Sequence, residues 1–434
     1  MHTNALAHHW MPFTANRAFF AQPRLLVRAE GMHYWSHDGR RILDGASGLF
    51  CCAAGHGRAE ITRAVAQQLE ELEYVPHFQF GHPASFELSA RLARLTPGDL
   101  DHLFFCNSGS EAVDTALKIA LAYHFARGEG QRLRFVSRER AYHGVNLGGT
   151  SLSGILRNRE AFGAVLPGVV HMRHTLGGHP RFVRGQPEQG AELADDLQRF
   201  CELYGGHSIA ACFVEPIAGS TGVLVPPLGY LQRLREICDR YGILLVFDEV
   251  ICGFGRTGRA FGADTFGVVP DMMTMAKALT NGAQPMGAVA VSDAVWQAIA
   301  GQAPEGAIEL FHGYTFSAHP AATAAALAAL EIYENEGLFE RAAALAPAFL
   351  DRMFALAELP VVTDVRGYGL LAAFDLAPGG AAGERGFRCL QRLYDNGLLI
   401  KWTGDTGIVA PPLIAGKSDI DEIGDILERT LAAL

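Results

Sequence analysis

No two of the eight cysteines in this sequence stand at the Cys-x-x-Cys spacing. The sequence therefore gives no indication of a disulfide framework. Several cysteines, such as Cys212 and Cys238, lie inside apolar runs. We expect buried thiols in a reducing compartment, which predicts a cytoplasmic protein.

Positive charge is also scarce, because 36 lysines and arginines face 46 acidic residues and the formal net charge is -10. This balance disfavours a nucleic acid or an anionic membrane as the main partner, although a phosphate group could bind locally. The alanine-rich stretch 320–330 is too short and too weakly apolar to span a bilayer. Residues 1–10 lack a basic segment followed by an apolar one, so we expect no signal peptide and no membrane partner.

The chain has no internal repeat and no low-complexity linker, but its 434 residues are enough for two or more compact units. Short apolar runs alternate with segments of helical periodicity through its middle. This alternation predicts an α/β fold, with a mostly parallel central sheet and helices on both faces. The strands are expected at 103–106, 134–136, 210–214, 243–247, 272–276 and 287–291.

The sequence suggests three segments. Residues 1–55 are expected to form an N-terminal arm, in which Asp38-Gly39 is typical of a hairpin turn. Residues 56–320 are expected to form the large domain around the parallel sheet. Residues 321–434, which begin within a long alanine-rich helix, are expected to form a smaller α+β domain. We expect the arm to join this C-terminal segment as one discontinuous domain.

Two apolar runs end at side chains of opposite charge. The run 243–247 ends at Asp248, and the run 272–276 ends at Lys277. Ligands of open α/β sheets bind at the carboxyl ends of the strands. An amine that forms a Schiff base and an acid that holds a pyridinium nitrogen are the pair that pyridoxal phosphate requires. The alternatives are a solvated surface lysine and an acid that caps a helix or binds Mg²⁺, although the chain has no P-loop lysine motif.

The turn Ser108-Gly109-Ser110 stands where a helix is expected to begin. Free N–H groups and the positive end of the helix dipole favour a phosphate there. The alternative is ordinary N-capping, with Ser108 and Glu111 in a capping box. Tyr142 follows another strand and would stack on a planar cofactor, while Val250 would pack on the opposite ring face or simply in the core.

The stretch Gly253-x-Gly255-x-x-Gly258 matches the dinucleotide fingerprint and follows a strand. The fingerprint requires a helix that opens at these glycines, whereas residues 259–270 show no apolar stripe of helical period. A nicotinamide oxidoreductase is therefore disfavoured. His171 and His174 have a metal-like spacing without an evident third ligand, so we expect surface histidines and no metal site.

Taken together, these motifs resemble the class III, fold type I aminotransferases, which use pyridoxal phosphate. The resemblance covers nearly the whole chain. The matching stretches are 107–112, 141–144, 213–216, 247–250, 253–258 and 275–278. Within the class, the sequence is most similar to the ω-amino acid:pyruvate, or β-alanine:pyruvate, aminotransferases. The stretches that carry this closer similarity are 9–17, 81–83, 280–282, 285–287 and 312–320.

The resemblance implies a role for each matched residue. Lys277 would carry the Schiff base and shuttle the substrate proton, while Asp248 would hold the pyridine nitrogen. The other implied cofactor contacts are Ser108, Gly109, Ser110, Tyr142, His143, Glu215, Val250 and Thr315. Among them, Glu215 would lie near the ring hydroxyl, and Thr315 would reach the phosphate in the neighbouring subunit. Members of the family are homodimers with shared active sites, so a homodimer or a dimer of dimers is expected.

Two positions depart from the most similar subfamily. Phe50 stands where its pocket tends to have tryptophan, and Lys401 stands where it has an arginine that grips the substrate carboxylate. Arginine offers a planar fork of donors, whereas lysine is a point charge on a flexible stem. Phe50, Tyr142 and Lys401 are the expected substrate contacts.

The resemblance implies a transaminase that works by a ping-pong mechanism. It would move an amino group from a small-molecule amine donor to a keto acid, pyruvate. The change at Lys401 predicts a donor range shifted toward longer ω-amino acids, diamines or simple amines. A racemase, an aminomutase or a decarboxylase remains the alternative, because these enzymes share the same cofactor chemistry.

Overall fold

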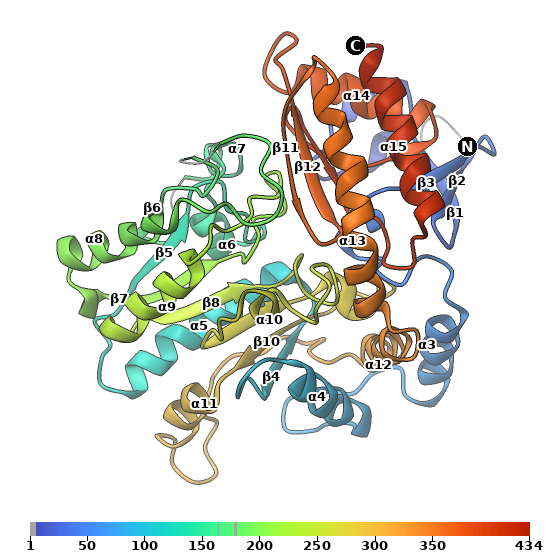
Figure 1. Cartoon of the computed structure of the whole chain (residues 1–434). Coiled ribbons are helices and arrows are strands. Elements are labelled where there is room, and N and C mark those ends of the chain that lie inside the picture. The colour runs from blue at the N-terminus through green and yellow to red at the C-terminus, as the bar shows by residue number, and fades with distance from the viewer. Residues whose placement is uncertain (1–5, 164, 178–179) are drawn as a thin grey trace.

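The computed structural model describes residues 6–163, 165–177 and 180–434. The first five residues of the expected N-terminal arm therefore lie outside the described residues. Figure 1 shows an open sheet flanked by helices, and a smaller group of strands and helices that carries both labelled chain ends.

The central sheet has seven strands in the order β4-β10-β9-β8-β7-β5-β6. These strands are β4 (His102–Cys106), β5 (Arg134–Arg138), β6 (Val169–Met172), β7 (Ile209–Val214), β8 (Leu244–Asp248), β9 (Met272–Met275) and β10 (Gly287–Val291). Within this described sheet, only β10 runs antiparallel to its neighbours. The prediction of a mostly parallel sheet is confirmed.

Several helices surround this sheet. They are α3 (Ala59–Glu71), α4 (Pro83–Leu95), α5 (Gly109–Ala126), α6 (Leu147–Leu152), α7 (Leu156–Arg159), α8 (Asp195–Tyr204), α9 (Tyr230–Tyr241), α10 (Gly262–Phe266), α11 (Asp293–Ala300) and α12 (Pro320–Asn335). Side chains alternate between the two faces along each strand. On β8, Leu245 and Phe247 pack in one hydrophobic cluster with α9, whereas Leu244 and Val246 pack in another with α5. Helices therefore cover both faces, as expected.

The smaller group contains two four-stranded sheets, with the orders β1-β2-β3-β13 and β11-β12-β15-β14. Their strands are β1 (Leu26–Glu30), β2 (His33–Ser36), β3 (Arg41–Asp44), β11 (Val362–Tyr368), β12 (Leu371–Leu376), β13 (Leu398–Leu399), β14 (Lys401–Thr403) and β15 (Thr406–Val409). The hairpin expected at Asp38-Gly39 joins β2 to β3. Because β13 pairs in parallel with β3, strands from the two ends of the chain share one sheet.

One short helix precedes the first three strands and another follows them, and longer helices pack on the C-terminal strands. They are α1 (Asn16–Ala21), α2 (Ser47–Phe50), α13 (Leu338–Phe354), α14 (Glu384–Asp395) and α15 (Lys417–Ala432). In Figure 1, α13, α14 and α15 lie beside β11 and β12, away from the central sheet.

The alanine-rich helix α12 supports a short 3₁₀ turn, η4 (Lys277–Thr280), which follows β9. This helix contacts α3, α4 and η4. Tyr333 lies on α12, is buried, and donates a hydrogen bond from its hydroxyl to the carbonyl of Ala278 at 2.5 Å. The helix thereby holds the turn that begins with Lys277.

Two expectations about burial need correction. Six of the eight cysteines are buried, but Cys51 and Cys52, which follow the short helix α2, are only half-buried. His171 and His174 are half-buried rather than on the surface, and His171 Nε2 lies 3.1 Å from the carbonyl oxygen of Leu152.

The structure also bears on two alternatives, a dinucleotide-binding glycine loop and a membrane-spanning helix. The glycine-rich residues 251–258 form turns, and no helix opens there, as expected. Among the described helices, none is both long enough and apolar enough to cross a membrane.

Candidate active site

A cavity of about 340 Å³ lies at the carboxyl ends of β8 and β9. Most of the residues predicted to bind a cofactor line it. They are Ser108, Gly109, Ser110, Tyr142, His143, Glu215, Asp248, Val250 and Lys277. Parallel pairing explains why they meet, since Asp248 on β8 is in register with Thr274 on β9, three residues before Lys277.

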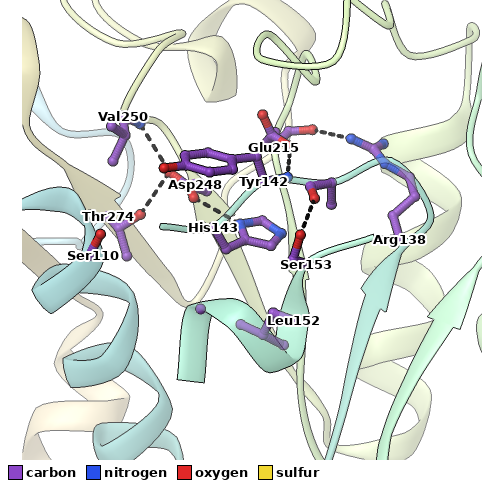
Figure 2. A network of polar contacts seen from close by, with 12 residues as sticks. Ser110, Arg138, Tyr142, His143, Leu152, Ser153, Glu215, Asp248, Val250 and Thr274 are labelled. Carbon is purple, nitrogen blue, oxygen red and sulfur yellow. Dashed lines mark hydrogen bonds and ion pairs between the residues drawn. The ribbon is translucent and has the colours of Figure 1, made fainter. Parts of the chain in front are cut away.

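Asp248 is buried and held by three hydrogen bonds, which Figure 2 shows. Its Oδ2 lies 2.8 Å from His143 Nδ1, and its Oδ1 accepts from Thr274 Oγ1 and Val250 N, both at 3.2 Å. A carboxylate only accepts hydrogen bonds, so His143 donates from Nδ1. These contacts fix the orientation of the carboxylate at the cavity wall.

Lys277 begins the turn η4 with a left-handed backbone, at a φ of 50°. Burial lowers the pKa of its amine, although the negative charges of Asp248, Cys51 and Glu215 act in the opposite direction. A lower pKa leaves more of the amine neutral near pH 7, and only the neutral amine is a nucleophile.

The turn at residues 108–110 is compatible with both predictions from its sequence, the N-cap and the phosphate site. Ser108 caps α5, because its hydroxyl accepts from Glu111 N at 3.1 Å. Glu111 turns its carboxylate to Asn107 N at 2.7 Å instead of completing the capping box with Ser108. Gly109 and Ser110 occupy the first helical turn, where N–H groups have no intrahelical partner, and they line the cavity. N-capping by Ser108 is therefore compatible with an anion at this turn.

Glu215, which also lines the cavity, holds the backbone of Tyr142. Its Oε1 accepts from Tyr142 N at 3.0 Å, and its Oε2 accepts from Gly219 N at 3.2 Å. Burial raises the pKa of Glu215 to about 7, and the nearby charge of Asp248 acts in the same direction. The carboxyl group can therefore hold or release a proton near neutral pH.

Sequence reasoning missed two residues of this network. Thr274 orients Asp248, and Arg138, which is fully buried, donates from Nη2 to the carbonyl of Glu215 at 2.9 Å. The signal for Thr274 was a single hydroxyl inside the apolar strand 272–275. Arg138 gave a similar signal as a charged residue at the end of a buried strand.

Three predicted residues do not line this cavity. Phe50 is buried, with a left-handed φ of 64°. Lys401 is half-buried and donates from Nζ to Thr403 Oγ1 at 3.3 Å and to the carbonyl of Trp402. Thr315 is exposed, and its carbonyl accepts from the hydroxyl of Tyr74 at 3.0 Å. Their predicted contacts with substrate or with a neighbouring subunit stay predictions.

Comparison with known proteins reveals similarity over nearly the whole chain. The family described as Aminotransferase class-III matches residues 15–431. The omega-aminotransferase of Caulobacter vibrioides is 52% identical over 431 residues, which cover 99% of this chain and 98% of that protein. The beta-alanine–pyruvate aminotransferase of Pseudomonas aeruginosa is 48% identical over 429 residues, covering 98% of this chain and 96% of that protein.

Similarity extends to solved structures. The omega transaminase of Pseudomonas jessenii in complex with PMP has a TM-score of 0.93 and 34% sequence identity. The alignment covers 99% of this chain and 97% of that chain.

Proposed function

Because this chain belongs to the class-III aminotransferases, we propose that it uses pyridoxal 5′-phosphate to move an amino group from an ω-amino acid or amine to pyruvate. One observation carries the proposal: Lys277 and Asp248, from the ends of neighbouring parallel strands, line the same cavity. A racemase, an aminomutase or a decarboxylase is not favoured, because the relatives are named as aminotransferases.

The cavity residues fit this cofactor. The first turn of α5 offers N–H donors for the phosphate. Gly109 keeps the approach open, because a Cβ there would lie 3.1 Å from a methyl group of Val250. His143 contacts Asp248 Oδ2, while Thr274 and Val250 donate to Oδ1. Held in this way at the cavity wall, the Asp248 carboxylate could pair with a protonated ring nitrogen. The related enzyme that was solved with PMP supports this assignment, since PMP is the amine form of the same cofactor.

Each of the cavity residues would have a distinct role in the reaction. When bound, pyridoxal phosphate supplies an electron sink for negative charge at the substrate carbon. Asp248 would keep the ring nitrogen protonated, and its three hydrogen bonds hold the carboxylate in place. The amine of Lys277, whose pKa burial lowers, would anchor the cofactor and then carry a proton at the substrate carbon. Tyr142 would cover one ring face, and Val250 the other.

The amine donor is proposed to be an ω-amino acid such as β-alanine, or an amine without a carboxylate. The name of the Pseudomonas aeruginosa relative supports β-alanine and pyruvate. Lys401 would contact the donor carboxylate in place of the subfamily's arginine, and this change would broaden the donor range. Phe50 and Tyr142 would form the apolar wall of the same subsite.

We also propose a cytoplasmic homodimer, or a dimer of such dimers, with shared active sites. Aromatic rings around Thr315 support this assembly, because Phe78, Phe311 and Phe316 are exposed in the single chain. Exposed apolar surface of this kind is typical of a protein interface. The eight free cysteines support a reducing compartment.

An absorbance scan followed by a donor panel tests the proposed function. We expect a visible band from the lysine-linked cofactor, and alanine as the product when pyruvate is mixed with β-alanine, a diamine or a simple amine. Lys277→Ala should abolish both signals. A protein with the visible band that forms no alanine from any donor would contradict transamination, and a protein that binds no pyridoxal phosphate would contradict the cofactor assignment.

A further inference from the structure

Two adjacent thiols lie behind one wall of the cavity. Cys51 and Cys52 follow α2, and both of their amides donate to the carbonyl of Ser47, at 2.9 and 3.0 Å. This shared acceptor fixes the backbone of the pair. In the described structure, the other six cysteines are buried, so these two are the most accessible thiols of the chain.

The two sulfur atoms face the same glycine of the cavity wall. A Cβ placed on Gly282 would lie 3.2 Å from Cys51 Sγ and 3.4 Å from Cys52 Sγ. Gly282 lines the cavity and closes the turn that begins with Lys277, since its N–H donates to the Lys277 carbonyl at 3.2 Å. An atom that bridges the two sulfurs would therefore lie next to this turn.

The local charges favour a reactive thiolate. A hydrogen bond from the Cys52 thiol lowers the pKa of Cys51, and the positive charge of Lys277 acts in the same direction, against the effect of burial. The hydrogen bond with Cys51 and then burial raise the pKa of Cys52, which therefore remains the hydrogen-bond donor. Thiolates are the form of cysteine that attacks electrophiles and binds soft metals.

Geometry decides what the pair can form. Consecutive Cα atoms lie about 3.8 Å apart across a trans peptide, whereas disulfides usually join Cα atoms about 4.4–6.8 Å apart. A direct disulfide between these neighbours is therefore strained. An atom that bonds to both sulfurs keeps them farther apart than an S–S bond would, so a bridged pair avoids this strain. No cluster of three or more histidine, cysteine or acidic side chains suited to a metal occurs among the described residues, so the bridging centre should need only two protein ligands.

We propose that Cys51 and Cys52 form a dithiol site for trivalent organic arsenicals, and that its occupation disables the adjacent cavity. A monosubstituted arsenic(III) oxide reacts with both thiols. Two S–H bonds and the arsenic–oxygen bond break, two As–S bonds form, and the oxygen leaves as water with both protons. Arsenic stays trivalent, so the step needs no oxidant. The bridged centre displaces the turn at Gly282 and with it Lys277.

Phenylarsine oxide is the probe, and intact-protein mass spectrometry is the first measurement. We expect the full-length protein to gain one phenylarsenic group and lose two hydrogens. The adduct should survive an excess of a monothiol and be released by dithiothreitol, because only a dithiol competes with two sulfur ligands. Cys51→Ser and Cys52→Ser should each lose the monothiol-resistant adduct.

The matched control is Cys238→Ser. Cys238 also hydrogen-bonds to another cysteine, Cys212, but both are fully buried, so this variant should keep the adduct. A resistant adduct in Cys51→Ser and Cys52→Ser, or no adduct on the wild type, would overturn the proposal. Circular dichroism confirms that each variant is folded.

The predicted loss of activity on labelling assumes the proposed transamination, whereas the predicted mass shift does not depend on it. Labelled wild-type protein should form less than a tenth of the alanine of untreated protein, and dithiothreitol should restore it. A resistant adduct with full activity would overturn the claim that the site disables the cavity. An unlabelled protein that forms no alanine would instead contradict the proposed function.

Discussion

Lys401 is a half-buried cation whose observed partners are neutral. Its Nζ donates to Thr403 Oγ1 and to the Trp402 carbonyl, and among the described residues no carboxylate pairs with it. Burial alone lowers the pKa of this amine. A charge in such surroundings gains from an anionic ligand, because the loss of water is then offset by an ion pair. The carboxylate of an ω-amino acid is a suitable anion.

Replacing Lys401 should therefore separate two kinds of donor. Lys401→Ala should raise KM for β-alanine about 10- to 100-fold, since hydrogen bonds to charged groups contribute about 1.5–3 kcal/mol. Lys401→Arg should lower KM for β-alanine, because the guanidinium holds a carboxylate with two parallel bonds. Steady-state kinetics with pyruvate measure both effects, and a simple amine without a carboxylate is the control. Equal changes for the two donors would mean that Lys401 has a structural role.

The sequence predicted the residues at strand ends well, but not those whose position depends on distant segments. Asp248 and Lys277 could be placed together because each follows an apolar run, and parallel strands end at one edge of a sheet. The contact of His143 with Asp248 joins positions 105 residues apart, and no local pattern encodes such a pairing. The surroundings of Lys401 likewise depend on how β14 packs against the loop at Ser220, whose carbonyl accepts from Thr403 at 2.7 Å.

At the scale of elements, the direction of a buried strand was not predictable. Every residue of β10 is buried, and a strand that is apolar on both faces has the same pattern whichever way it runs. Only the structure therefore reveals that β10 runs antiparallel to β4 and β9. The segment boundaries at 1–55, 56–320 and 321–434 stay a prediction. The pairing of β13 with β3 is a reason to propose that the first and last segments fold together.

The turn η4 is fastened to the N-terminal segment by Asn281. Its Oδ1 accepts from Ala54 N at 2.8 Å, and its Nδ2 donates to the Gly55 carbonyl at 2.9 Å, while its own φ is 53°. Asn281→Gly should destabilise the protein by about 1–3 kcal/mol, because buried backbone groups lose their partners. Asn281→Ala should cost about 1 kcal/mol more, since alanine disfavours a left-handed backbone. Thermal unfolding measures both variants, and equal midpoints for alanine and glycine would contradict the role of the backbone.

A buried acid, Glu249, accepts hydrogen bonds from the first amides of α10, and its titration predicts a dependence of stability on pH. Its carboxylate accepts from Gly262 N at 2.9 Å and Ala263 N at 2.7 Å. Burial outweighs these two bonds and raises the pKa of Glu249 from 4.5 to about 8. The folded protein therefore binds this proton more tightly than the unfolded chain. The contribution to stability is complete below about pH 4.5 and is lost as the pH rises to about 8, by about 1.4 kcal/mol per pH unit.

Glu249→Gln removes this titration while it keeps the size of the side chain. We expect the melting temperature of the wild type to fall relative to that of the variant as the pH rises from 4.5 to about 8, the limits of the titration window. Glu60→Gln is the control, because the pKa of Glu60 is lowered by hydrogen bonding to its own backbone N–H. Its titration lies below this range, so its difference should stay constant. A constant difference for Glu249→Gln would show that burial does not govern this acid.

At the scale of the whole molecule, one chain leaves an apolar surface around Thr315 in water. Phe311 is 88% exposed, and Phe316 stacks edge-to-face on Tyr74 with ring centroids 6.1 Å apart. Phe78 lies against Gly313, where an added Cβ would be 2.8 Å from its ring. Burial of such rings contributes about 25 cal/mol per Å², so the proposed dimer would gain stability from burying this surface. Thr315 would then lie at the cavity of the partner, in keeping with its absence from the cavity of its own chain.

A hybrid of two inactive chains tests this shared site. Thr315→Asp should weaken phosphate binding by charge repulsion, and Lys277→Ala removes the nucleophile, so each homodimer should be inactive. In a two-fold symmetric hybrid, the chain with intact Lys277 receives the intact Thr315 of the other chain. One of its two sites is then restored, and the hybrid, purified through two different tags, should show about half the wild-type activity. If Thr315 serves the cavity of its own chain, both sites carry a defect and the hybrid stays inactive.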